Sequence, residues 1–257
     1  MILNNHSEII DYPIDINRFP LAQKCKFIKA VINENQYLYI PNRWFHLVLT
    51  DPNTVAISFD ILEIDGNKEN YFYNYYKNRI PFKKNGNKYK FDYNGFINSS
   101  LNSEFTVLHS NSHDCSPVIK NDDQQKYFKN NKLQNVLENR NNNEYLYVGS
   151  NDIPRHNNYK EITDYINFDE ETRNKYVDNL FEYNFDYNFK DYDDNVYLKC
   201  DRSFWMTLDK GINSGLHYDD YGKFLYVLHG KKTVYLAPYT SKDNLYITTY
   251  DKAYTIN

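Results

Sequence analysis

The stretch Asn213-Ser-Gly-Leu-His217-Tyr-Asp219-Asp-Tyr-Gly222 presents an imidazole and a carboxylate two residues apart. It continues as Lys223-Phe-Leu-Tyr-Val-Leu-His-Gly230-Lys-Lys-Thr-Val-Tyr-Leu-Ala-Pro238, which predicts a strand and a hairpin that returns through His229-Gly230. Residues i and i+2 of a strand point to the same face. We therefore expect His217 and Asp219 to lie side by side. With one further histidine they would form the facial triad that binds Fe(II) and leaves coordination positions open.

The composition permits one large domain. The chain has 257 residues, of which 41% are hydrophobic, and its 27 Tyr and 16 Phe are bulky residues that favour strands. Because no linker rich in Pro, Ser or Gly divides the sequence, we expect a single domain over residues 1–257. The net charge is −4 with both signs interspersed, and no basic block indicates a nucleic-acid interface.

Cysteine usage and hydropathy indicate the compartment. Cys25, Cys115 and Cys200 are far apart and form no C-x-x-C pair, which argues against a cysteine zinc site or a disulfide framework. The sequence has no apolar run near 18 residues and no signal peptide. We expect a soluble, cytoplasmic protein with no membrane partner.

Apolar periodicity predicts a mostly β chain. Four early strands are expected to form a compact antiparallel meander, and residues 240–257 are strand-like. Two helices are predicted, because acids occupy their first turns and, in the first of them, apolar residues recur at helical spacing. The early strands are predicted at 26–32, 37–40, 43–49 and 54–62, later strands at 104–108, 144–148 and 201–208, and the helices at 121–139 and around 170–181.

Two stretches resemble the metal-binding motifs of the JmjC and cupin-like 2-oxoglutarate oxygenases, and most of all the branch that contains the hypoxia-inducible-factor asparaginyl hydroxylase. The run from Phe204 to Pro238 resembles the first motif, which carries the His-x-Asp ligands. The run Gln36-Tyr-Leu-Tyr-Ile-Pro-Asn-Arg-Trp-Phe-His46, after Asp15-Ile-Asn-Arg-Phe-Pro20, resembles the second motif, which ends in the distal histidine. His46 falls on that position.

The resemblance implies a double-stranded β-helix, the jelly-roll barrel of cupins, with flanking helices. It implies that His217, Asp219 and His46 hold Fe(II) and form the catalytic centre. Lys232 and Ser214 match positions that contact the distal carboxylate of 2-oxoglutarate, and Tyr147 matches, more weakly, a tyrosine that binds the same cosubstrate. Trp44, Tyr218 and Tyr226 are expected in the substrate pocket.

One substitution departs from the family pattern. Ser58 takes the place of an Asn that is often found there. A Ser cannot make the same paired hydrogen bonds, so that contact with the cosubstrate is in question.

The order of the two motifs is reversed in this chain. His46 precedes His217 by 217 − 46 = 171 residues. Circular permutation is the plain interpretation, with residues 1–63 as the C-terminal half of the barrel motif and residues 64–257 as the N-terminal half. Two alternatives are domain swapping, in which His46 of one chain completes the site of another, and a degraded gene that joins two partial copies.

The resemblance implies an Fe(II)- and 2-oxoglutarate-dependent oxygenase that hydroxylates a protein side chain, or RNA, and releases succinate and CO2. One alternative is a non-catalytic cupin-like binding module that has lost activity. Another is a metal-dependent sugar isomerase or dioxygenase, whose sites usually use more histidines. The protein is expected to be a monomer or a homodimer.

Several residues have a simpler interpretation. Outside its motif, His46 would be read as a core histidine and Lys232 as a solvated strand lysine. His109, His113 and His156 lie in polar segments and are expected to be solvated.

Overall fold

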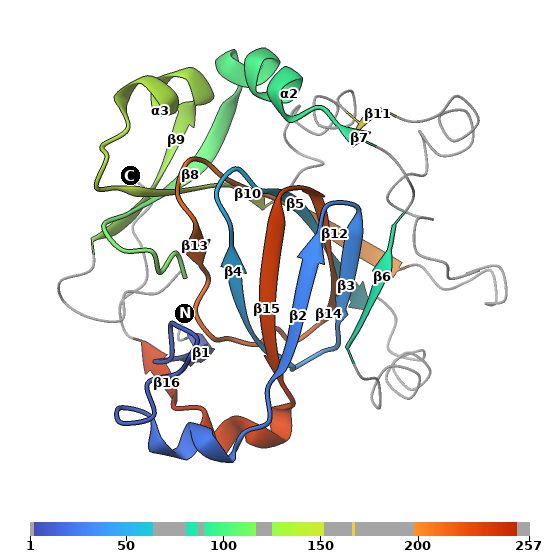
Figure 1. Ribbon diagram of the computed structural model, residues 1–257, viewed down its shortest axis with the longest axis vertical. Coiled ribbons are helices and arrows are strands. Elements are labelled where there is room, and N and C mark those ends of the chain that lie inside the picture. The colour runs from blue at the N-terminus through green and yellow to red at the C-terminus, as the bar shows by residue number, and fades with distance from the viewer. Residues whose placement is uncertain are drawn as a thin grey trace, which may run out of the picture.

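Two antiparallel sheets of unequal size pack face to face as a β-sandwich (Figure 1). The structure, a computed structural model, describes residues 3–63, 81–86, 90–116, 125–151, 166–167 and 198–250. The mostly β fold predicted from the sequence is confirmed. The larger sheet has the order β6 (Phe82–Asn85), β3 (Gln36–Ile40), β14 (Gly222–His229), β5 (Val55–Glu63), β12 (Leu198–Thr207), β10 (Tyr145–Asn151), β8 (Glu104–Ser110) and β9 (Lys126–Lys132). The smaller sheet has the order β13 (Ile212–Asn213), β4 (Phe45–Thr50), β15 (Lys231–Ala237) and β2 (Ile28–Asn33).

Shorter elements complete the described chain. Two strand pairs stand apart from the main sheets, and in one of them segments from opposite ends of the described chain run side by side (Figure 1). The pairs are β1 (Leu3–Ser7) with β16 (Ile247–Tyr250), and β7 (Lys90–Phe91) with β11 (Ile166–Asn167). The helical elements are η1 (Pro20–Lys24), α2 (Tyr93–Ser99), η2 (Ser100–Asn102), α3 (Leu133–Asn139) and η4 (Tyr239–Asn244).

The predicted meander is wrong, because successive early strands alternate between the two sheets. Strands β2 and β4 both flank β15 in the smaller sheet, whereas β3 and β5 both flank β14 in the larger one. A strand followed by a short turn has the same local sequence whether the next strand pairs with it or crosses to the opposite sheet. Tertiary packing decides between the two, and here each strand has an apolar face to bury against the opposite sheet.

The predicted hairpin at His229-Gly230 is also wrong, because the two strands that it joins do not pair with each other. Strands β14 and β15 lie in different sheets, so this turn passes the chain from one sheet to the other. Gly230 has a φ of +80°, a conformation that glycine adopts without a steric penalty. A Cβ at this position would also collide with Thr54.

Of the helix predicted over residues 121–139, the structure describes residues 125–139, and only residues 133–139 of these are helical. Residues 126–132 are strand β9, which pairs with β8 at the edge of the larger sheet. The helix α3 begins at Leu133 and buries Leu133 and Val136, which share a helix face. The helix predicted around 170–181 lies outside the described residues, as does the end of the chain after residue 250.

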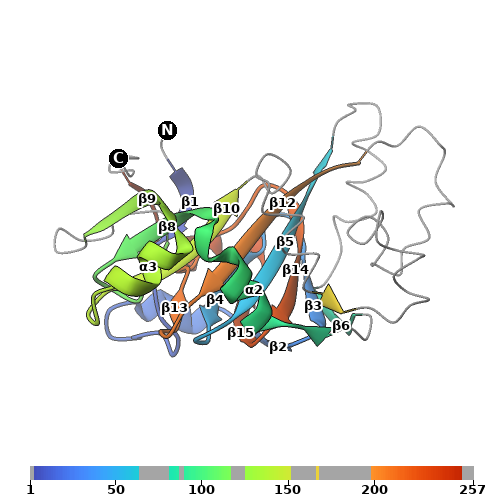
Figure 2. The same ribbon diagram turned by 90° about the horizontal axis from the view of Figure 1, so that it is seen from above.

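Alternate residues of each strand divide between the interior of the sandwich and its outer faces. On β4, Phe45 and Leu47 pack outward against a cluster that includes Phe19 from the N-terminal segment. The intervening residues point into the sandwich. The outer face of the larger sheet carries a second cluster, to which α2 and α3 contribute Phe96, Leu133 and Val136; Figure 2 shows α3 beside β8 and β9.

A membrane-crossing helix, which would need greater length and apolar character, does not occur among the described residues.

Candidate metal centre

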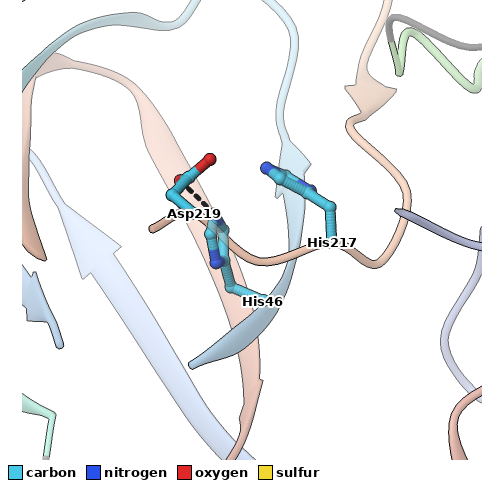
Figure 3. Close-up of side chains that lie close together, drawn as sticks. All are labelled: His46, His217 and Asp219. Atoms are coloured by element: carbon cyan, nitrogen blue, oxygen red, sulfur yellow. Dashed lines mark ion pairs between the residues drawn. The ribbon is translucent and has the colours of Figure 1, made fainter. Parts of the chain in front are cut away.

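The three predicted metal ligands converge within a single chain. His46 comes from β4, and His217 and Asp219 come from the segment between β13 and β14 (Figure 3). One ligand atom from each of the three residues lies within 4.8 Å of the other two. Nε2 of His46 is 3.4 Å from Oδ2 of Asp219. A partner chain is therefore not needed to bring His46 to the other two ligands.

Main-chain hydrogen bonds hold the segment that carries His217 from both sides. This segment is not a regular strand, and His217 forms only isolated bridges, one to His46 and one to His6. On the β4 side, the His46 amide donates to the His217 carbonyl at 2.7 Å, and the His217 amide donates back at 3.1 Å. On the other side, residues 5–9 run alongside it. Their bonds are Ser7 N to Leu216 O (2.8 Å), Leu216 N to Ile9 O (2.9 Å) and Tyr218 N to Asn5 O (3.0 Å).

Backbone carbonyls select the tautomer of both imidazoles. Nδ1 of His46 lies 3.0 Å from the carbonyl oxygen of Trp44, and Nδ1 of His217 lies 3.0 Å from that of Gly215. Because a carbonyl can only accept, each Nδ1 carries the proton and each Nε2 keeps its lone pair. Histidines that bind metals usually donate their other ring N–H to such an acceptor.

Burial keeps both imidazoles neutral. It lowers the pKa of His46 to about 4 and the pKa of His217 to about 3. Burial also acts to raise the pKa of Asp219, but the neighbouring charges, above all the ammonium of Lys223, outweigh it, so this carboxyl has a pKa below its ordinary value. Lys223, on β14, forms an ion pair with Asp219. At neutral pH the centre thus offers two imidazole lone pairs and one carboxylate, a donor set that suits a divalent transition metal.

A buried lysine lies farther along the same interior face. Lys232 is 1% exposed and stands directly opposite Thr50, which follows His46 by four residues on β4. Its Nζ donates to Thr50 Oγ1 at 2.9 Å and to the hydroxyl of Tyr147 at 3.4 Å. No carboxylate pairs with it in the part of the chain that the structure describes. Burial lowers the pKa of Lys232 to about 7.

Tyr147 belongs to a chain of contacts on the larger sheet. Its ring stacks on Trp205 at a centroid distance of 5.0 Å, and Nε1 of Trp205 donates to Ser58 Oγ at 3.1 Å. The absence of a side chain at Gly149 makes room for the Trp205 ring, because a Cβ at this position would lie 2.9 Å from it. Burial raises the pKa of Tyr147, so it remains a phenol that can donate a hydrogen bond. Ser58, the departure from the family pattern, supports the indole in this structure.

Of the other predicted site residues, Ser214 lies beside Val48 of β4 and Trp44 joins the interior cluster, whereas Tyr218 and Tyr226 belong to the outer clusters. Oγ of Ser214 accepts from the Val48 amide at 3.3 Å, so this hydroxyl is bound to the β4 backbone. Trp44 packs at the edge of the interior cluster between the sheets. Tyr218 packs edge-on against Phe45 on the outer face of the smaller sheet, and Tyr226 belongs to the outer cluster of the larger sheet. The structure therefore does not bring Tyr218 and Tyr226 to the metal centre, because their rings pack in the outer clusters.

Three residues of the centre were missed from the sequence. Thr50 could have been found, because residues i and i+4 of a strand share a face and it follows His46 at that spacing. Lys223 and His6 had no such signal, since Lys223 is the second residue of a strand and His6 lies in a polar N-terminal stretch.

The structure describes two of the three histidines that were expected to be solvated. His109 is buried, with Nδ1 2.7 Å from Glu144 and its ring stacked on Tyr127, so that prediction is wrong for it. His113 is partly exposed and hydrogen-bonds to Asp11. His156 lies outside the described residues.

Comparisons of this chain with protein-family models, with curated proteins and with solved structures give no match. The chemistry of the centre is therefore inferred from its own residues and from the resemblance of the two motifs.

Proposed function

We propose that this chain is an Fe(II)- and 2-oxoglutarate-dependent oxygenase that hydroxylates a protein side chain, with RNA as the alternative substrate class. The observation that carries the proposal is the convergence of His46, His217 and Asp219 on one point of the interior face that also holds the buried Lys232. The two histidines and Asp219 suit a metal, and Lys232 suits an anion. An oxygenase of this class needs both sites.

His46, His217 and Asp219 would hold the metal. Two imidazoles and one carboxylate are the donor set of non-haem Fe(II) oxygenases, which keep the remaining positions open. When bound, the iron would supply the redox chemistry that couples O2 reduction to decarboxylation of 2-oxoglutarate. The carbonyls of Trp44 and Gly215 keep both Nε2 atoms unprotonated, and the charge of Lys223 keeps the carboxyl ionised.

Lys232, Thr50 and Tyr147 would bind the distal carboxylate of 2-oxoglutarate. In the structure the ammonium donates to both hydroxyl oxygens, which leaves both hydroxyl protons available to another acceptor. An ammonium and two O–H donors around one point suit a carboxylate, which would supply the counter-charge that a buried lysine requires. In this proposal Thr50 takes the role that the resemblance gave to Ser214.

The sandwich is proposed to be a jelly roll in circularly permuted order. The alternation of β2, β3, β4 and β5 between the sheets supports this architecture, in which interior faces of opposed strands can share a ligand. Permutation accounts for a distal histidine that precedes the His-x-Asp pair in the chain. The pairing of β1 with β16 brings opposite ends of the described chain together, as a permuted barrel allows.

The proposal is tested by the conversion of 2-oxoglutarate to succinate by Fe(II)-loaded protein. Wild-type protein should form succinate, and His217→Ala should not. His109→Ala is a matched control, because it removes a buried, stacked histidine of β8 that is not among the three ligands, and it should leave turnover unchanged. Metal-loaded wild-type protein that neither binds nor consumes 2-oxoglutarate would refute the proposal.

A second candidate is a cupin-like binding module without catalysis. It is favoured by one contact, the ion pair in which Lys223 already supplies a cation to the metal-binding carboxylate of Asp219. Purified protein that contains no metal and has no affinity for added Fe(II) or Mn(II) would support this candidate over the oxygenase.

A further inference from the structure

We propose that His6, on β1, is a positioning residue that holds the His217 ring in its metal-binding orientation. The inference rests on the proposed metal centre and extends it to the N-terminal arm, which we define as residues 5–11. Nothing in the family motifs pointed to this arm.

The contact that suggests this role is a ring stack. His6 is 3% exposed, and its imidazole lies on that of His217 with a centroid distance of 5.1 Å and an interplanar angle of 11°. The ring of His46 also lies against His217, at 4.2 Å and tilted by 55°. The Gly215 carbonyl holds the Nδ1 edge of the ring. Together these contacts restrict the rotation of the His217 side chain and leave Nε2 directed toward the other two ligands.

The arm itself is firmly attached, so His6 has a fixed place from which to act. Ser7 is fully buried; its amide bonds to Leu216, and its hydroxyl donates to the Leu245 carbonyl at 2.5 Å. Oδ1 of Asn5 accepts from Nδ1 of His6 at 2.9 Å, and Nδ2 of Asn5 donates to the Tyr218 carbonyl at 2.7 Å. The arm therefore bonds to the residues immediately before and after His217.

The geometry distinguishes a positioning residue from a fourth ligand. His6 is not among the three residues whose ligand atoms lie within 4.8 Å of one another. Its ring is nearly parallel to that of His217, so the two imidazoles meet through their faces. A face contact restrains a ring without directing a nitrogen lone pair at the shared point.

The test measures Mn(II) affinity and the visible spectrum of Co(II)-loaded protein in His6→Ala, His6→Phe and His109→Ala. His6→Ala should weaken Mn(II) binding by about tenfold or more, the usual effect of removing a group that orients a metal ligand. It should also change the Co(II) spectrum, which reports ligand geometry. His6→Phe keeps a planar ring and should restore both. His109→Ala removes an equally stacked imidazole elsewhere and should match wild-type protein.

Two results would overturn the proposal. One is wild-type Mn(II) affinity and an unchanged Co(II) spectrum in His6→Ala. The other is an equal loss in His6→Phe, which would mean that an imidazole nitrogen, and not the ring face, is required.

A measurement on metal-free protein separates this inference from the proposed function. In 15N spectra of histidine-labelled protein, wild-type His217 should show one tautomer, with the proton on Nδ1 facing the Gly215 carbonyl. In His6→Ala the ring should be free to rotate away from this carbonyl, so His217 should show a mixture of tautomers. If wild-type protein binds no metal yet shows this change, the metal centre is refuted and the positioning role of His6 stands. If the tautomer is the same in both proteins, the positioning role is refuted.

Discussion

The main chains of His46 and His217 exchange two hydrogen bonds, at 2.7 and 3.1 Å, although the residues lie 217 − 46 = 171 positions apart. The two imidazoles are therefore placed relative to each other by the backbone of β4 and of the segment before β14. Asp219 follows two residues later and completes the set (Figure 3). A constellation fixed in this way needs little rearrangement to accept a metal.

Removal of any one ligand should nearly abolish metal binding. His46→Ala, His217→Ala and Asp219→Ala are each expected to weaken Mn(II) affinity by at least about 100-fold, since loss of a group that merely orients a ligand already costs 10–100-fold. Isothermal titration with Mn(II) measures this. His229→Ala is the control, because His229 lies at the far end of β14 and pairs with Glu34. Wild-type affinity in any of the three ligand variants would contradict the assignment.

Lys232→Met should abolish 2-oxoglutarate binding and yet stabilise the fold. The variant loses the cation for the distal carboxylate but should keep Mn(II) affinity, because Lys232 contacts none of the three ligands in the described structure. Since burial lowers the pKa of Lys232 from 10.5 to about 7, its charge is disfavoured in the folded state. We expect a gain in unfolding free energy on the order of a few kcal/mol at pH 7.

The pH dependence of that gain has a definite sign. Between pH 7 and 10.5 unfolded wild-type protein carries a proton on Lys232 that folded protein lacks, so this residue makes wild-type stability rise with pH over this window. Urea unfolding at pH 7 and pH 9 should show a smaller difference between the variant and wild-type protein at the higher pH. A difference that grows with pH would contradict the neutral, buried state of Lys232.

Binding of 2-oxoglutarate should weaken at alkaline pH. The ammonium of Lys232 must be protonated to pair with a carboxylate, and in the unliganded protein its pKa is about 7. The Kd should be nearly constant below this value and should rise about tenfold per pH unit above it. Titration of Mn(II)-loaded protein with 2-oxoglutarate from pH 6 to pH 9 checks this slope. A constant Kd over the whole range would exclude Lys232 as the carboxylate partner.

The structure and the sequence motif differ on which hydroxyl binds the distal carboxylate of 2-oxoglutarate. The structure favours Thr50, and the motif favours Ser214. The structure places the Thr50 hydroxyl 2.9 Å from Lys232 Nζ, whereas the Ser214 hydroxyl accepts from the backbone of β4. Thr50→Val should weaken 2-oxoglutarate affinity by about tenfold or more, the effect of one lost hydrogen bond to a charged group. Ser214→Ala should stay close to wild type. The reverse order of effects would favour the assignment made from the motif.

Local patterns were enough to predict most strands, and the two motifs predicted which three residues converge in the candidate metal centre. The ligand set was accessible because His217 and Asp219 are neighbours on one motif and His46 closes the other. Strand pairing was not accessible, because the apolar pattern of β2 to β5 is the same for a meander and for strands that alternate between two sheets. Residues 126–132 were assigned to a helix because the apolar spacing of residues 121–139 fits one. Pairing with β8, a long-range contact, makes them a strand.

The residues that support the centre are placed by contacts between segments that lie far apart in the sequence. His6 meets His217 only when the N-terminal arm lies against residues 216–218, and no local pattern encodes that approach. Tyr147 was found from its motif, but its support by Trp205 and Ser58 became visible only in the folded sheet.

The most direct test of the oxygenase assignment is an anaerobic titration of Fe(II)-loaded protein with 2-oxoglutarate, followed by visible absorption. A keto acid that chelates Fe(II) produces a metal-to-ligand charge-transfer band. We predict that this band appears and saturates in wild-type protein and in His109→Ala, and that it is absent in His217→Ala and in Lys232→Met. An Fe(II)-loaded wild-type protein that shows no such band at saturating 2-oxoglutarate would contradict the proposed function.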